Sequence, residues 1–93
     1  MHVAILILEL HIPDAQSLKS KRQVLKSIKD KVRAKYNVSV AEFGDLDKWQ
    51  RVNLGFSSIS TDQDHLRDMM QKIMSMVEGS GEALITSQEL EFV

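Results

Sequence analysis

The first dozen residues constrain the fold of this chain more than any other stretch. Residues 2–12 read HVAILILELHI. The run is dense in aliphatic and β-branched residues and stops at Pro13, which is typical of a β-strand. Both of its alternating sets are apolar, so we expect burial on both faces of the strand. One set is Ala4, Leu6, Leu8, Leu10 and Ile12, and the other is Val3, Ile5 and Ile7.

The remaining sequence predicts two helices and three further strands. Ser17 can cap a helix that runs to about Tyr36, with Asn37 as a C-terminal stop. Thr61 followed by Asp64 predicts a capping box for a second helix. The apolar stripe expected along that helix is Leu66, Met69, Met70, Ile73, Met74 and Val77. Strands are expected at 38–43, 50–60 and 82–92.

The resulting order, βαββαβ, indicates a ferredoxin-like α+β fold in a single domain, 1–93. That fold has one four-stranded antiparallel sheet with both helices on one face. Right-handed crossovers then make the strands at 2–12 and 50–60 central and the other two edges. The helix-free face would leave Val3, Ile5 and Ile7 bare. Either these are ordinary exposed aliphatics, or they form a homodimer or partner surface; we expect a homodimer.

Composition narrows the class of protein without naming a function. The 93 residues are 43% hydrophobic and 27% charged and contain no cysteine. This excludes disulfide and thiolate chemistry and fits a cytoplasmic protein. The N-terminal apolar run is interrupted by Glu9 and His11 and is too short to span a bilayer, so no membrane partner is expected.

Positive charge is concentrated in one predicted helix, although the net charge of the chain is only −1. Residues 17–36, SLKSKRQVLKSIKDKVRAKY, hold eight Lys or Arg and one Asp. Helical spacing lines up five of these cations on one exposed flank, away from the sheet and without interleaved glutamate. The stripe is Lys19, Arg22, Lys26, Lys29 and Arg33. It could be a solvated face, a surface for RNA phosphates, or a contact for an acidic protein.

Two residues near this helix allow alternative interpretations. Lys21 falls close to the apolar side in the first turn, where it either snorkels past the core, which we favour, or makes a specific contact. Trp49 lies in the turn before 50–60; it could stack on a base, but we favour a plug at the end of the core. The outward residues of the central strands lack the stacking aromatics of an RNA-recognition motif.

The sequence shows no complete catalytic or metal-binding set. Glu42, Asp45 and Asp47 could hold a hard cation, which suggests a metal-dependent hydrolase, but turn chemistry accounts for the aspartates. Glu9 and His11 share a strand face, and two ligands are too few for a zinc site. We therefore expect no enzyme activity, metal, cofactor or small-molecule substrate.

Three segments resemble a known family. They are SLKSKR at 17–22, YNVSVAE at 36–42 and WQRVNLG at 49–55. In this order they are similar to the YlxP-like family, a bacterial domain of unknown function, over essentially the whole chain. The resemblance implies a ferredoxin-like fold and no established catalytic residues. Ser17, Lys19, Lys21, Arg22, Glu42 and Trp49 match its motifs.

Members of that family are often encoded beside transcription-antitermination, translation-initiation and ribosome-maturation factors, which implies a role near RNA or the ribosome. Together with the basic stripe, this predicts a non-catalytic RNA-binding or ribosome-associated accessory protein. The alternative is a homodimeric protein-interaction module that binds an acidic partner and no nucleic acid.

Overall fold

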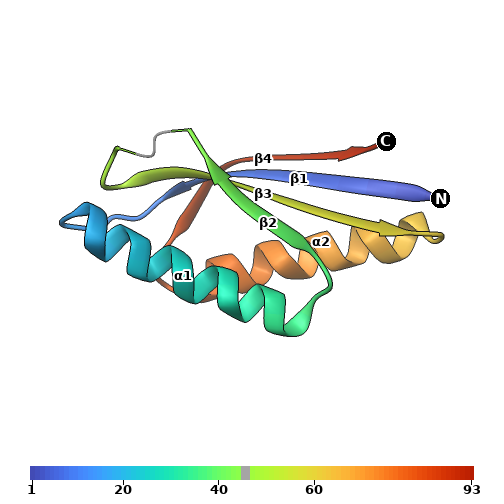
Figure 1. The fold of residues 1–93 in the computed structure, drawn as a ribbon, viewed down its shortest axis with the longest axis horizontal. Coiled ribbons are helices and arrows are strands. Elements are labelled where there is room, and N and C mark those ends of the chain that lie inside the picture. Colours follow the sequence, from blue (N-terminus) through green and yellow to red (C-terminus); the bar gives the residue numbers. More distant parts are fainter. Residues whose placement is uncertain (45–46) are drawn as a thin grey trace.

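A computed structural model of the protein describes residues 1–44 and 47–93. Its elements are β1 His2–His11, α1 Leu18–Lys35, β2 Ser39–Phe43, β3 Arg51–Ser60, α2 Gln63–Gly79 and β4 Leu84–Phe92. The strands form one antiparallel sheet in the order β2-β3-β1-β4, and both helices lie against one face of it (Figure 1). The predicted ferredoxin-like architecture, with β1 and β3 central, is confirmed.

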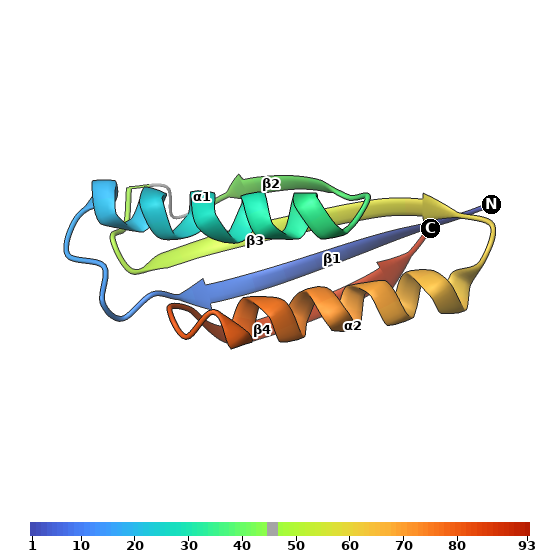
Figure 2. The ribbon, with the colours of Figure 1, turned by 90° about the horizontal axis from the view of Figure 1, so that it is seen from below.

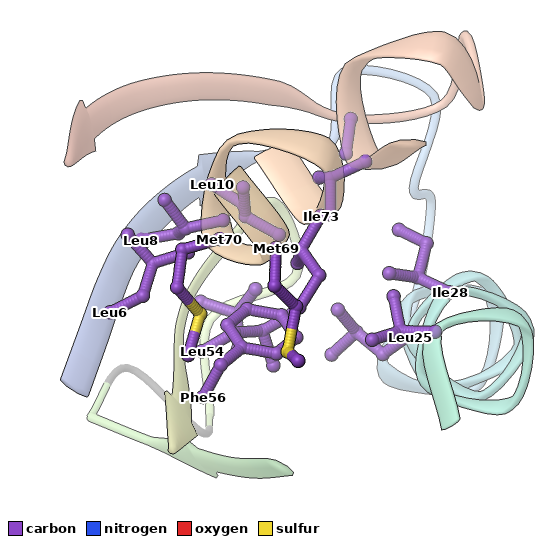
Figure 3. Packing of buried hydrophobic residues seen from close by; sticks show 14 of the residues in the cluster. Leu6, Leu8, Leu10, Leu25, Ile28, Leu54, Phe56, Met69, Met70 and Ile73 are labelled. Atoms are coloured by element: carbon purple, nitrogen blue, oxygen red, sulfur yellow. The ribbon is translucent and has the colours of Figure 1, made fainter. Parts of the chain in front are cut away.

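The core lies between the sheet and the two helices (Figure 3). One alternating set of β1, from Ala4 to Leu10, is fully buried on this side, and Leu54 and Phe56 of β3 lie beside it. The helices contribute Leu25, Ile28, Val32, Leu66, Met70, Ile73 and Val77. Burying each such side chain stabilises the fold by about 1.5–3 kcal/mol.

The two faces of β1 differ in burial. The set that faces the helices is inaccessible to solvent, whereas Val3, Ile5 and Ile7 on the opposite face are half-buried. Double burial of β1 is therefore not achieved by this chain alone, because both helices cover the same side. In the described part of the chain, no helix has the length and apolar character to cross a membrane.

Several element ends differ from the sequence expectation. The N-cap of α2 is Asp62 rather than Thr61, since its Oδ1 accepts from the N–H groups of Asp64 at 3.0 Å and His65 at 3.2 Å. Within α2, Met74 of the expected apolar stripe is only partly buried. β4 begins two residues later than expected, after the buried Ala83. Threonine and aspartate are both good caps, so the sequence does not separate adjacent candidates.

The reassigned cap is testable by substitution. We expect Asp62→Ala to lower the free energy of unfolding by about 1 kcal/mol, because two N–H groups of the first turn lose their acceptor. Thr61→Ala should stay within about 0.5 kcal/mol of wild type. Urea denaturation measures both. A larger loss for Thr61→Ala than for Asp62→Ala would contradict the assignment.

Candidate nucleic-acid interface

Helix α1 begins at a capping box built from two serines. Ser17 Oγ accepts from the backbone N–H of Ser20 at 3.1 Å, and Ser20 Oγ accepts from the N–H of Ser17 at 3.2 Å. This reciprocal arrangement satisfies backbone donors that a helix start leaves open. It fixes the helix phase, and with it the direction of every cation that follows.

The basic stripe lies beside the sheet edge. The buried side of α1 is formed by Lys21, Leu25, Ile28 and Val32. The stripe is centred about 110° further around the helix. Lys29 Nζ lies 3.9 Å from Glu42 Oε2 on β2, and Arg33 Nη2 donates to the Val40 carbonyl of β2 at 3.2 Å. The expectation of a flank away from the sheet was wrong, because the edge strand β2 borders this flank.

The stripe also has an acidic neighbour. Lys26 Nζ contacts Asp30 Oδ2 at 2.7 Å, one helical turn away. That hydrogen bond, with the charges of Lys26, Arg33 and Lys29, holds the pKa of the Asp30 carboxyl below its ordinary value. The stripe lacks interleaved glutamate, but Asp30 supplies an acid beside it. The pair is solvent-exposed and contributes little energy, so its lysine can exchange partners.

The accessibility of the five cations varies. Lys19, Arg22, Lys26 and Arg33 are exposed, and Lys29 is half-buried between α1 and β2. A phosphate can therefore reach four of the five without movement of the backbone. Lys29 is the least accessible member of the stripe.

Lys21 makes a specific contact, so the snorkelling that we favoured from the sequence was wrong. Its side chain is buried, and its Nζ donates to the Lys48 carbonyl at 2.5 Å. It therefore does not extend past the core into solvent. The contact fastens the first turn of α1 to the segment that leads into β3.

Trp49 follows this anchored residue and is 55% exposed. Our interpretation of Trp49 as a plug for the end of the core was therefore wrong. The neighbouring Gln50 makes the local connections instead, because its side-chain amide donates to the carbonyls of Pro13 and Ala15 at 3.1 Å each. The indole is left on the surface.

The acidic residues do not assemble into a metal centre among the residues that the structure describes, where no group of three or more metal-ligating side chains occurs. Glu42 Oε2 is buried without a hydrogen-bond partner there, beside a 170 Å³ pocket. Asp47 is exposed, and Asp45 lies outside the described residues. Glu9 contacts Arg51 at 3.7 Å and accepts from Thr86 Oγ1 at 2.9 Å.

A second basic surface lies on the opposite flank of α1, and sequence reasoning missed it. The helices are staggered, so that their C-terminal halves lie side by side (Figure 2). A groove of about 610 Å³ between them is lined by Lys31, Lys35 and Tyr36 of the α1 end and by Lys72 of α2. Lys31 and Lys35 are four residues apart, which signals a shared flank, whereas no local pattern links Lys72 to them.

The groove lysines are held by local contacts. Lys72 Nζ lies 2.9 Å from Asp68 Oδ2, and this hydrogen bond raises the pKa of Lys72. Lys35 Nζ lies 5.8 Å from the centre of the Tyr36 ring, within cation–π range. Lys31 and Lys35 on one flank and the stripe on the other make α1 cationic on both flanks.

Comparison with known proteins places the chain in a family. The family model described as "Protein of unknown function (DUF503)" matches residues 3–90. The chain belongs to this family. The uncharacterized protein YlxP of Bacillus subtilis is 39% identical over 70 residues, which cover 75% of this chain and 76% of that protein. The resemblance to the YlxP-like family is thus confirmed, and the family description assigns no activity.

Solved structures share the fold at low identity. A structural-genomics protein, YJCS, aligns with a TM-score of 0.62 at 8% identity, covering 96% of each chain. A designed protein with a ferredoxin fold, LFR1 1, aligns at 0.61 with 14% identity, covering 98% of this chain and 85% of that one. SnoaB, a cofactor-independent oxygenase from Streptomyces nogalater, aligns at 0.52 with 9% identity, covering 99% and 90%. Such identities show the fold alone.

The buried contact of Lys21 gives a stability prediction. Lys21→Met keeps most of the apolar stem but leaves the Lys48 carbonyl without this donor, so we expect a loss of about 1–3 kcal/mol in the free energy of unfolding. Lys19→Met, two residues earlier and exposed, should change it by less than about 0.5 kcal/mol. Urea denaturation followed by circular dichroism compares them. Equal effects would show that the contact is not stabilising.

Proposed function

We propose that this protein is a non-catalytic RNA-binding or ribosome-associated accessory protein that contacts phosphates through α1. The helix carries eight Lys or Arg against Asp30 within its 18 residues. At a rise of about 1.5 Å per residue, this charge is spread over roughly 27 Å. A surface of this kind neutralises phosphates and releases their counterions.

One observation carries the proposal: both flanks of α1 are cationic. The stripe borders β2, and Lys31 and Lys35 meet Lys72 of α2 across the groove. Like charges at helical spacings of three and four destabilise a helix by a few tenths of a kcal/mol per pair. Asp30, Glu42 and Asp68 each neutralise one of these cations in part. A bound anionic backbone would offset the repulsion among the others.

The expected mode of binding is contact with the sugar-phosphate backbone. The outward residues at the centre of the sheet include Ile5, Ile7, Gly55 and Ser57, which offer no aromatic ring for a base. Phosphate contacts position a protein on RNA but carry no sequence information. Sequence preference should therefore be slight.

An acidic protein is the second candidate ligand, and a specific feature favours it. β2 is an edge strand, and the Val40 carbonyl points outward to Arg33. An extended acidic segment could add to this edge while its carboxylates meet the stripe. Both ligands predict salt sensitivity, so binding of purified RNA has to separate them.

RNA binding by the purified protein is the decisive measurement. We expect fluorescence anisotropy to detect binding of labelled single-stranded or structured RNA at low salt. If five cations each neutralise one phosphate of a single strand, the slope of log affinity against log salt should be about −3.5, from about 0.7 per contact. No binding of either RNA at low salt would rule out the proposed function and leave the acidic partner.

Charge placement is tested by matched variants. Arg22→Glu with Lys26→Glu reverses two accessible stripe cations and should abolish binding, whereas reversing Lys29 would oppose it to Glu42 and disturb the fold. For a control outside α1, Arg67→Glu on the exposed side of α2 is compared with Arg22→Glu alone, which makes the same change in net charge; Arg67→Glu should weaken binding only slightly. Equal losses in these two single variants would show that net charge, rather than α1, governs the affinity.

A further inference from the structure

The face of the sheet opposite the helices carries an apolar hollow. Figure 1 shows both helices on one side and no helix on the other. A groove of about 340 Å³ crosses β1, β3 and β2 on that open side. Its walls include Ile5, Ile7 and Phe43, and Gly55 lies between them. Phe43 is 42% exposed, which is high for a phenylalanine.

Gly55 is the feature that makes this face informative. It lies in the interior of β3, paired with Ile7 of β1 and Ala41 of β2, where glycine weakens a strand. A Cβ built there would lie 3.5 Å from Ile7 Cδ1 and 3.7 Å from Phe43 Cε1, which are ordinary contacts, and its φ is not in the left-handed region. Among the residues that the structure describes, nothing therefore excludes the Cβ of an alanine at this position. Such a residue often marks the close approach of another surface.

We propose that a second copy of the chain packs face to face on this sheet, with Ile7 of each copy seated in the hollow above Gly55 of the other. The proposal is independent of RNA binding. Ile7, which is half-buried, and Gly55 lie opposite each other on adjacent, directly paired strands. A two-fold axis between β1 and β3 places Ile7 of one copy over Gly55 of the second copy, and Ile7 of the second copy over Gly55 of the first. The surface is therefore complementary to itself.

The size of the face fits a stable dimer. β1, β3 and β4 have nine or ten residues each and are roughly 30–33 Å long, whereas β2 has five, so the sheet is four strands wide over only about half of its length. With about 4.8 Å between strands, the planar footprint is about 540 Å², and the accessible area of the side chains on it is larger. A typical specific interface buries about 800 Å² per partner.

Charge sets the direction of the axis. Glu89 and Glu91 of β4 stand beside Ile7 and Ile5 at one margin of the face. An axis perpendicular to the strands would stack β4 on β4 and oppose these carboxylates. An axis parallel to the strands places β4 over β2 of the second copy, which presents Ser39 and Ala41. We therefore assign the parallel axis.

The oligomeric state tests the interface. Sedimentation velocity should find wild type as a dimer at 100 µM. Ile5→Lys places a charge in the contact, and Gly55→Leu fills the hollow, so both should sediment as monomers while keeping the wild-type circular dichroism spectrum. Gln71→Lys, on the exposed side of α2, adds the same charge elsewhere and should remain dimeric. A monomeric wild type, or two variants that stay dimeric, would overturn the proposal.

Cross-linking tests the arrangement without disturbing the hollow. Because the chain has no cysteine, single cysteines can be introduced at will. A mixture of Glu89→Cys and Ala41→Cys chains, after exchange of subunits, should give a heterodimer with a short bis-maleimide. Glu89→Cys alone should give little product. Efficient self-linking of Glu89→Cys, or no mixed product, would refute the parallel axis.

Discussion

A four-stranded sheet has two faces, and this chain supplies helices for only one of them. The leucines of β1 and the apolar residues of β3 reach full burial because α1 and α2 both pack on their side. The opposite side chains of β1 remain half-buried, although they are just as apolar. This asymmetry follows from right-handed crossover connections, which put both helices of a βαββαβ chain on the same side. The open apolar face of the sheet results from it.

The same constraint leaves most of α1 available for charge. Packing on the sheet needs one side of the helix, where Leu25, Ile28 and Val32 are buried. The rest of the circumference faces solvent, β2 or α2, and lysine and arginine occupy much of it. Lys21 is the exception, since its ammonium lies inside and bonds a backbone carbonyl. The helix thus packs on the core, contacts the segment before β3 through Lys21, and presents cations to the surface.

The spacing of hydrophobic residues and the order of the elements predicted the fold. Strands bury every second residue and helices bury residues about 3.6 apart, so the sequence distinguishes the two. Caps were less certain, since Thr61 and Asp62 are adjacent and chemically similar. The helical phase gave the angular position of the stripe correctly but not its neighbour, because the position of β2 depends on tertiary packing. The pairing of Asp30 with Lys26 follows the local i,i+4 pattern and could have been predicted. The position of Lys72 opposite Lys31 and Lys35 and the exposure of Trp49 depend on tertiary packing, which no local pattern encodes.

The pairing of β1 affects how the chain can fold. This central strand bonds β3 on one side and β4 on the other, and the backbones of Val3 and Val93 exchange hydrogen bonds of 3.1 and 2.9 Å. To form such non-local contacts, the chain must first lose the entropy of closing long loops, and this slows folding. During synthesis β1 emerges first and its β4 neighbour last. The aliphatic strand β1 therefore stays unpaired on its β4 side until nearly the whole domain has been synthesised. Until then its apolar side chains and backbone groups can form non-native contacts.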